Sequence, residues 1–333
     1  MQVHQDIGHL PAFERCVLTI GTFDGVHLGH RQIIAQLKTE ASRINGETVI
    51  ITFHPHPRKI IDSSKPPIHL LNTIEEKIEL LEALGINHLV VVPFDERFSQ
   101  MSAEDYIEQF LVNKFHPHTI IIGYDHHFGK GRSGNYLLLE EYSLKLGFQL
   151  IEISPHIIEE NTVSSTRIRQ ALQQGDITAA NSLLGYDYFF DGVVIEGNKL
   201  GRTLGYPTAN LDVKDKEKLV PANGIYVVEA LLVNGERSAV RGNPGTGQSP
   251  NTVTHAVLKG MMSIGVRPTL TDGKFMIEVN IFDFNEDIYN KVLRVYVKNY
   301  LRPEIKFENL DALKDQLAKD KQATLHYFDT SAG

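Results

Sequence analysis

The sequence has a single cysteine, no long hydrophobic run and no excess of positive charge. Its one cysteine, Cys16, excludes an intrachain disulfide and a cysteine-rich zinc site. No segment approaches the roughly 18 consecutive apolar residues of a transmembrane helix. The N-terminus lacks the basic flank and apolar run of a signal peptide. We therefore expect a cytoplasmic protein with no membrane partner.

The charge and the length limit the partners and the number of domains. The 333 residues carry a net charge of −8 at pH 7, which argues against nucleic acid or an anionic membrane as the main partner. Hydrophobic residues make up 42% of the chain, which is enough for buried cores. At a typical length of about 150 residues per domain, a chain of this length is predicted to form two domains. Weak self-association is left open.

The chain is organised around residues 21–30, Gly-Thr-Phe-Asp-Gly-Val-His-Leu-Gly-His. A short buried strand is predicted before them at 17–20, and the apolar spacing of 32–37 predicts an amphipathic helix after them. A turn at such a junction presents backbone N–H groups and the positive end of the helix dipole to an anion. The stretch therefore predicts an anion site.

Three glycines and two histidines support that interpretation. Gly21, Gly25 and Gly29 let the backbone approach a ligand closely, with positive φ where the turn requires it. His27 and His30 lie three residues apart on one face of the first helical turn, where both can contact the same phosphates. A turn with two surface histidines is the alternative, and this combination of residues makes it the weaker one.

The first half of the chain alternates predicted strands and helices. Strands are predicted at 17–20, 48–53, 89–94, 118–123 and 149–153, and helices at 73–84 and 103–114. Thr73 is a candidate N-cap with Glu76 three residues on, and Gly85 ends that helix. This order predicts an α/β fold with a parallel, doubly wound sheet.

Beyond residue 184 the pattern changes to short β runs separated by glycine and proline. The runs are at 189–196, 225–233, 238–240, 261–265, 275–282 and 292–301. They predict a small six-stranded antiparallel β-barrel, and residues 310–325 predict a terminal helix. We therefore predict two domains, 1–184 and 185–333, with residues 241–252 as a long insertion between strands.

Two polar loops follow predicted strands of the first half, where open α/β sheets bind ligands. Residues 54–58, His-Pro-His-Pro-Arg, are expected to form an extended loop because proline ends strand pairing. Residues 123–134 hold four glycines, two histidines, a lysine and an arginine. A solvated loop is the alternative there, and a metal site lacks a third ligand at a recognisable spacing.

A Ser-Ser-Thr cluster at 164–166 precedes an apolar helical run. An N-cap cluster explains it structurally. The same hydroxyls and N–H groups suit triphosphate oxygens, and Arg169 suits the charge that spreads over a leaving group. The two interpretations are compatible.

These motifs resemble a known family. His27-Leu28-Gly29-His30 resembles the HxGH signature of the nucleotidylyltransferase superfamily, and 21–30 as a whole resembles the N-terminal module of the prokaryotic bifunctional riboflavin kinase/FAD synthetases. Residues 164–169 match the superfamily's second motif, Ser-Ser-Thr-x-x-Arg. The resemblance implies a Rossmann-like FMN adenylyltransferase domain in which His27, His30 and Arg169 are catalytic. It also implies a set of ATP contacts: Gly21, Phe23, Asp24, Gly25, Gly29, Ser164, Ser165 and Thr166.

The same resemblance implies a flavin side to this site. Pro55, His56 and Pro57 match the family pattern, whereas His54 stands where the family usually has an acidic residue. The 123–134 loop is similar to the family's Gly-x-Asp-x-x-Phe-Gly-Lys-x-Arg, which assigns Asp125 and Phe128 to the flavin.

In the second half, residues 197–211 resemble the riboflavin kinase signature Gly-x-x-x-Gly-Arg-x-Leu-Gly-Tyr/Phe-Pro-Thr-Ala-Asn. Glycines alone would indicate a hairpin loop, because the Lys-Ser/Thr ending of a P-loop is missing. The resemblance implies ATP contacts at Gly197, Gly201, Gly205 and Pro207. It implies Mg²⁺ ligands at Thr208 and Asn210, and oxygen donors suit that ion.

Two further residues gain roles from the resemblance. Glu278 lies between Ile277 and Val279 in a predicted strand, where a solvent-facing position would explain it locally. The resemblance makes it the base that takes the proton from the riboflavin 5′-hydroxyl. Arg302 belongs to a segment that closes over flavin in the family.

The resemblance therefore implies an enzyme that uses Mg²⁺ and ATP to make FMN from riboflavin and then FAD from FMN. Two alternatives stay open. The N-terminal domain could transfer another nucleotide or none, although the 123–134 loop is of the flavin type. The chain could instead be a flavin-binding or regulatory protein, although a mere binder has no need of Glu278 or the two histidines.

Overall fold

A computed structural model describes residues 1–61, 67–123, 126–153, 163–197, 200–233, 257–266 and 275–331. Its contacts divide the chain into two compact units, Met1–Ser165 (unit 1) and Thr166–Gly333 (unit 2). The predicted strand at 238–240 and the predicted insertion at 241–252 lie outside the described residues.

Unit 1 is built on a six-stranded sheet whose paired strands all run parallel, in the order β1-β4-β3-β2-β5-β6. The strands are β1 (Gln2–His4), β2 (Val17–Ile20), β3 (Thr48–His54), β4 (His88–Pro93), β5 (Thr119–Gly123) and β6 (Gln149–Ile153). The predicted parallel, doubly wound sheet is confirmed. β1 was not predicted, because three residues carry too little periodicity. The strand order reverses at β2, and ligands of such sheets bind beside the carboxyl end of that strand.

The helical segments of unit 1 connect these strands. They are α1 (Leu28–Ile44), α2 (Pro57–Ile61), α3 (Ile74–Ala83), α4 (Glu96–Ser99), α5 (Ala103–Asp105), the π-helix η1 (Tyr106–Val112), α6 (Asn113–Phe115), the 3₁₀ turn η2 (Lys130–Arg132) and α7 (Tyr136–Leu146). The Thr73–Glu76 capping box predicted for α3 is present. One prediction is corrected and one is refined. Residues 57–61 form a short helix rather than an extended loop, because proline suits the first helical position. The helix predicted at 103–114 is wound as a π-helix in its middle.

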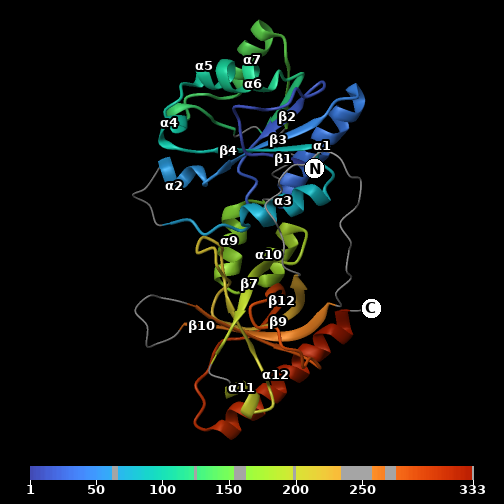
Figure 1. The fold of residues 1–333 in the computed structure, drawn as a ribbon, viewed down its shortest axis with the longest axis vertical. Coiled ribbons are helices and arrows are strands. Elements are labelled where there is room, and N and C mark those ends of the chain that lie inside the picture. The colour runs from blue at the N-terminus through green and yellow to red at the C-terminus, as the bar shows by residue number, and fades with distance from the viewer. Residues whose placement is uncertain are drawn as a thin grey trace. The chain divides into compact units, whose positions relative to one another are not determined.

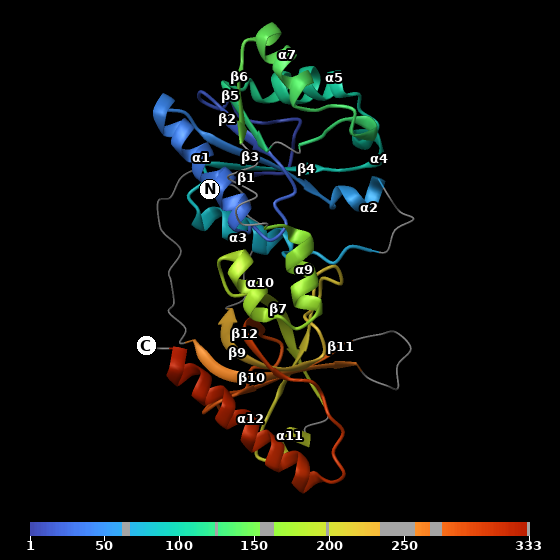
Figure 2. The ribbon, with the colours of Figure 1, turned by 180° about the vertical axis from the view of Figure 1, so that it is seen from behind.

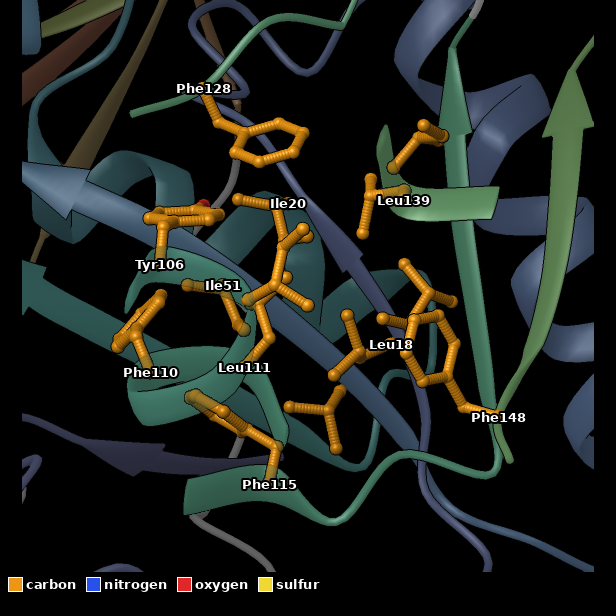
Figure 3. Packing of buried hydrophobic residues seen from close by; sticks show 14 of the residues in the cluster. Leu18, Ile20, Ile51, Tyr106, Phe110, Leu111, Phe115, Phe128, Leu139 and Phe148 are labelled. Carbon is orange, nitrogen blue, oxygen red and sulfur yellow. The ribbon is translucent and has the colours of Figure 1, made fainter. Parts of the chain in front are cut away.

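Two hydrophobic clusters lie on the two faces of this sheet, as strand alternation requires. Val17 of β2 packs with α1 and α3 residues such as Leu37 and Leu81. Leu18 and Ile20 pack in the opposite cluster, which Figure 3 shows with the aromatic rings of η1 and with Phe128. Cys16 is buried, and burial raises the pKa of its thiol.

Unit 2 is a closed antiparallel barrel of order β10-β11-β8-β7-β12-β9. Its strands, labelled in part in Figures 1 and 2, are β7 (Phe189–Ile195), β8 (Ala209–Asp212), β9 (Gly224–Val233), β10 (Leu258–Val266), β11 (Phe275–Ile281) and β12 (Val292–Arg302). The predicted six-stranded barrel is confirmed. β8 was missed because it lies inside the glycine-rich signature, which reads as a loop.

The helices of this part of the chain are α9 (Ser165–Gln173), α10 (Ile177–Leu184), α11 (Leu200–Thr203) and α12 (Leu310–Ser331). α12 is the predicted terminal helix, extended by six residues beyond its predicted end, and it packs on β10 (Figure 2). α10 packs on β12, where Asn181 Nδ2 donates to the Val297 carbonyl at 2.9 Å. Among the helices that the structure describes, none is long and apolar enough to cross a membrane.

Candidate active sites

The first candidate site begins at the carboxyl end of β2. The chain leaves β2 at Ile20, turns through residues 21–27 and enters α1 at Leu28. Positive φ occurs at Phe23, Gly25 and Val26, so only one of the three predicted glycines has it. Gly21 and Gly29 serve close packing instead. A Cβ at Gly21 would lie 3.1 Å from the Phe23 ring, and one at Gly29 would lie 3.3 Å from the His27 ring.

His27 and His30 are brought together, as their spacing predicted. His27 caps α1, and its Nδ1 accepts a hydrogen bond from the His30 backbone N–H at 3.3 Å. The two rings stack with centroids 3.7 Å apart and an angle of 13° between their planes. Burial lowers the pKa of His30 well below its ordinary value, and the nearby charges of His27 and Lys77 act in the same direction. His30 is therefore neutral at pH 7.

One buried atom at this site has no hydrogen-bond partner among the residues that the structure describes. Within the described part of the chain, Nδ1 of His30 makes no hydrogen bond although it is covered from solvent. An unsatisfied buried nitrogen is unfavourable and requires an explanation, such as a ligand that completes the site. This observation agrees with a functional role for His30.

Asp24 connects the first motif to other segments. Its buried carboxylate accepts hydrogen bonds from the backbone N–H groups of Leu71 and Asn72 at 2.9 and 3.3 Å. The Ser165 hydroxyl donates to the Asp24 carbonyl at 2.8 Å. The two superfamily motifs, separated by 141 positions here, therefore meet in unit 1. Asp24 shapes the turn through its backbone and its carboxylate.

The remaining residues of the second motif lie on either side of Ser165. Ser164 is exposed. Thr166 and Arg169 lie on α9 in unit 2, where Thr166 is exposed and Arg169 is half-buried. α9 begins at Ser165, so the apolar helical run predicted after the Ser-Ser-Thr cluster is confirmed.

Sequence reasoning missed Lys77 at this site. Lys77 lies on α3 and is 7% exposed. Its Nζ donates to the Thr22 carbonyl at 2.7 Å and lies 3.4 Å from Thr52 Oγ1. Burial lowers the pKa of Lys77 to about 8, against the opposing effect of Asp24. A signal was present, because Lys77 shares the apolar helical spacing of Ile74, Ile78 and Leu81.

The predicted flavin residues of unit 1 lie in different environments, and one of them lies outside the described residues. Pro57 opens α2, and His56 Nδ1 accepts from the Arg58 N–H at 3.2 Å. Asp125 lies outside the described residues. Phe128 is 6% exposed, and its ring stacks on Tyr106 at a centroid distance of 5.0 Å (Figure 3). The structure therefore assigns Phe128 a place in the core beneath the 126–134 segment.

The second candidate site is a cavity of about 320 Å³ in unit 2. It gathers four of the residues that the kinase resemblance singled out: Gly201, Thr208, Glu278 and Arg302. The cavity also has an apolar wall, to which Met261, Met262 and Met276 contribute. Ligand pockets for small molecules combine an apolar lining with a few polar groups in this way.

Glu278 reaches this cavity because strands alternate their faces. Ile277 and Val279 are buried, whereas Met276, Glu278 and Asn280 line the cavity. Glu278 is paired in register with Ser263 of β10 and with Asn210 of β8. The Glu278 carboxylate and the Asn210 amide therefore lie on the same face of the barrel sheet, in one row of cross-strand neighbours.

Glycines hold the signature segment close to this row. A Cβ at Gly197 would lie 2.1 Å from Asn210 Nδ2, and one at Gly201 would lie 2.3 Å from the Tyr206 carbonyl oxygen. Gly205 has φ of +84°, and the Pro207 carbonyl accepts from Asn280 Nδ2 at 2.7 Å. Gly197, Gly205, Pro207 and Asn210 surround the cavity residues without being among its lining.

Arg302 is held by a residue that sequence reasoning missed. Its guanidinium donates to both carboxylate oxygens of Asp320 on α12, at 2.9 and 2.6 Å. Gln316 Nε2 donates to the same carboxylate at 2.9 Å. The Asp320 side chain is 5% exposed and also lines the cavity. Arg302, the last residue of β12, is therefore bound to Asp320 of the terminal helix at the cavity wall.

Comparisons with known proteins match both halves of the chain. The FAD synthetase family model matches residues 10–167, and the riboflavin kinase family model matches residues 184–328. The bifunctional riboflavin kinase/FMN adenylyltransferases of Haemophilus influenzae and Escherichia coli are 35% and 34% identical over 315 residues. These matches cover 95% of this chain and 95% and 93% of those proteins. The Bacillus subtilis enzyme of the same description is 35% identical over 318 residues, covering 94% of this chain and 93% of its own.

A solved structure extends the match to three dimensions. It is described as a macrolide-efflux protein from Streptococcus pneumoniae, is 28% identical, and has a TM-score of 0.82 with 97% of each chain covered. Two family models in this order, and relatives aligned along almost their whole length, leave one conclusion. The chain belongs to the family of bifunctional riboflavin kinase/FMN adenylyltransferases.

Proposed function

We propose that the chain makes FAD from riboflavin in two ATP-dependent steps. The barrel of unit 2 phosphorylates riboflavin to FMN, and the nucleotidylyltransferase part adenylylates FMN and releases pyrophosphate. The observation that carries the first step is the cavity in which Glu278 and Thr208 meet an apolar wall. The observation that carries the second is the stacked pair His27–His30, in which His30 Nδ1 is covered, joined to Ser165 through Asp24.

In the kinase step, Glu278 acts as the general base. It takes the proton of the riboflavin 5′-hydroxyl while that oxygen bonds to the γ-phosphorus of ATP and the bond to the ADP oxygen breaks. Phosphoryl transfer requires little more from a protein than positioning and charge stabilisation. The methionine wall suits the apolar isoalloxazine ring, and Arg302, fixed by Asp320, provides a cation at the flavin.

The residues around Glu278 fit a magnesium–nucleotide. Thr208 supplies a hydroxyl at the cavity, and Asn210 supplies an amide oxygen in the row of Glu278. These are the hard oxygen donors that Mg²⁺ prefers. When bound with ATP, the ion neutralises charge on the transferred phosphates. Gly197, Gly201, Gly205 and Pro207 bring the backbone near those phosphates in this proposal.

In the adenylylation step, an FMN phosphate oxygen attacks the α-phosphorus of ATP, and the bond to pyrophosphate breaks. Neutral His30 donates an N–H to the phosphates together with His27, and Arg169 balances the charge of the leaving group. Gly21, Phe23, Asp24 and Gly25 of the turn and Gly29 of α1 lie around the triphosphate in this proposal. Ser164, Ser165 and Thr166 add donors. Pro55, His56, Pro57, Asp125 and Phe128 form the flavin side of the site in this proposal.

The kinase half of this proposal is tested by Glu278→Gln. Loss of a general base typically lowers the rate about 10²–10⁴-fold, so FMN formation should fall by that factor. FAD synthesis from supplied FMN should continue, because the two sites share no motif. Glu286→Gln, at an exposed loop position, is the matched control and should leave both rates unchanged. A Glu278→Gln enzyme that phosphorylates riboflavin within a few-fold of the parent rate would refute the assignment.

Location and self-association belong to the same proposal. We infer a cytoplasmic enzyme with small-molecule partners, without nucleic acid or membrane binding, from the sequence composition. Cell fractionation tests the location. Analytical ultracentrifugation across a concentration range tests the weak self-association that the sequence leaves open.

A further inference from the structure

We propose that Lys77 is a positioning residue of the adenylyl-transfer site, which holds the turn 21–27 in the conformation that presents His27 and His30. The inference rests on the proposed function of that site. It concerns a residue outside both sequence motifs, on a helix that begins 44 positions after His30.

The turn contains backbone conformations that require external support. Phe23 and Val26 have φ of +47° and +37°, a region that side chains with a Cβ occupy only at a cost, and Val26 is β-branched. Such residues persist where surrounding contacts fix them, and they concentrate at functional sites. The contacts that fix this turn therefore determine where the two imidazoles stand.

Lys77 supplies one of these contacts, at 2.7 Å. The Thr22 carbonyl, directly before Phe23, accepts from Lys77 Nζ at 2.7 Å and from the Thr52 hydroxyl at 3.1 Å. The segment before α3 holds the other side of the turn, because the Leu71 N–H donates to the Asp24 carboxylate. Lys77 of α3 and the segment before α3 thus hold the turn at two positions, Thr22 and Asp24.

An ammonium group at this depth needs a reason, since burial of a charge is unfavourable unless it is paired. The titratable groups that act on it or share its surroundings are Asp24 and His27 of the turn and His30 of α1. Asp24 favours the charged form of Lys77, and the Lys77 charge favours neutral His30. Lys77 therefore supports both the shape of the turn and the protonation state of its catalytic histidine.

The test compares three variants in the full chain. Lys77→Met removes the donor and the charge at similar volume, whereas Lys77→Arg keeps both. Lys38→Met is the matched control, because Lys38 also donates to a backbone carbonyl at 2.7 Å, that of Leu84, but lies exposed on α1. Lys77→Met should lower kcat/KM for FAD formation from FMN about 10²-fold through misplacement of the site, with riboflavin kinase activity unchanged. Lys77→Arg should recover most of the loss, and Lys38→Met should match the parent.

The pH profile separates positioning from simple structural support. The pKa of Lys77 is lowered to about 8, so the ammonium is lost as the pH rises through that value. FAD formation by the parent should therefore decline above about pH 8. Lys77→Arg should extend the plateau, because arginine stays charged there. A profile that is identical in the parent and in Lys77→Arg would overturn the proposal.

A readout without turnover keeps this inference distinct from the proposed function. The imidazole proton resonances of His27 and His30 should shift in Lys77→Met and stay near their parent positions in Lys38→Met. If the parent makes no FAD but these resonances shift, the proposed function fails and the positioning role survives. If the parent makes FAD and Lys77→Met keeps both the rate and the resonances, the positioning role fails alone. Should Lys77→Met not fold, Lys77→Gln takes its place with the same expectations.

Discussion

At the scale of single residues, the proposed adenylyl-transfer site depends on the protonation state of one imidazole. His30 is stacked on His27, packed near Phe23 and covered at Nδ1. Because burial and two neighbouring charges lower its pKa, it offers a neutral N–H donor rather than a second positive charge. Preorganised donors of this kind stabilise charge that develops during the reaction.

Replacing His30 with alanine tests that role. The variant should lose about 10²–10³-fold in turnover of FAD synthesis, or ~2.7–4 kcal/mol of transition-state stabilisation. FMN binding should change far less, and riboflavin kinase activity should survive. His9→Ala, at an exposed position of unit 1, is the control. Normal turnover of the remaining FMN complex with weakened FMN binding would instead make His30 a flavin or structural contact.

At the scale of elements, the terminal helix helps to build the cavity that we propose as the kinase site. Leu313, Leu317 and Asp320 of α12 line it, and Asp320 fixes Arg302 at the end of β12. The helix is therefore part of the site and not only an end to the chain.

Asp320→Ala tests this contribution. It removes two charge-assisted hydrogen bonds and leaves a mostly covered guanidinium without its partner, so unit 2 should lose about 1–3 kcal/mol of unfolding free energy. KM for riboflavin should rise more than kcat falls, because Arg302 then loses its fixed position. Urea denaturation and steady-state kinase assays give the two values. Asp329→Ala, exposed near the end of the same helix, should change neither, and an Asp320→Ala enzyme with parental KM and stability would refute the link.

Apolar periodicity predicted the longer strands and helices well, but it missed short elements and residues whose roles depend on distant partners. The buried strands of unit 1 and the capped helix α3 follow directly from apolar spacing and from the Thr73–Glu76 pair. β8 was missed because its four residues follow glycines and a proline, and only pairing with β7 and β11 makes them a strand. Lys77 and Asp320 were missed because their roles depend on partners distant in the sequence, the Thr22 carbonyl and Arg302. Local patterns do not contain such pairings.

At the scale of the whole molecule, the contacts group α10 with the barrel. Asn181 bonds to the Val297 carbonyl and, through its Oδ1, accepts the Tyr188 N–H at 2.8 Å. Ile177 and Leu184 of the same helix are buried. The sequence-based boundary between 184 and 185 remains a prediction, and the contact division at Ser165 makes it testable.

Two fragments of the second half measure where the stable unit begins. The 166–333 fragment should unfold with a higher free energy than the 185–333 fragment. Losing burial of Ile177 and Leu184 corresponds to about 3–6 kcal/mol at ~1.5–3 kcal/mol for each side chain. Thermal unfolding of both, with kinase activity as the check on folding, gives the difference. Equal stability would show that α9 and α10 add nothing to the barrel.

The central claim is that one chain carries out both steps with two molecules of ATP. The most direct measurement supplies riboflavin, Mg²⁺ and ATP labelled with different phosphorus isotopes at the α and γ positions, and follows the labels in the flavins over time. The account predicts FMN that carries only the γ label, followed by FAD that carries the γ and α labels in equal amounts. Flavin that never gains the α label, or gains neither label, would contradict it.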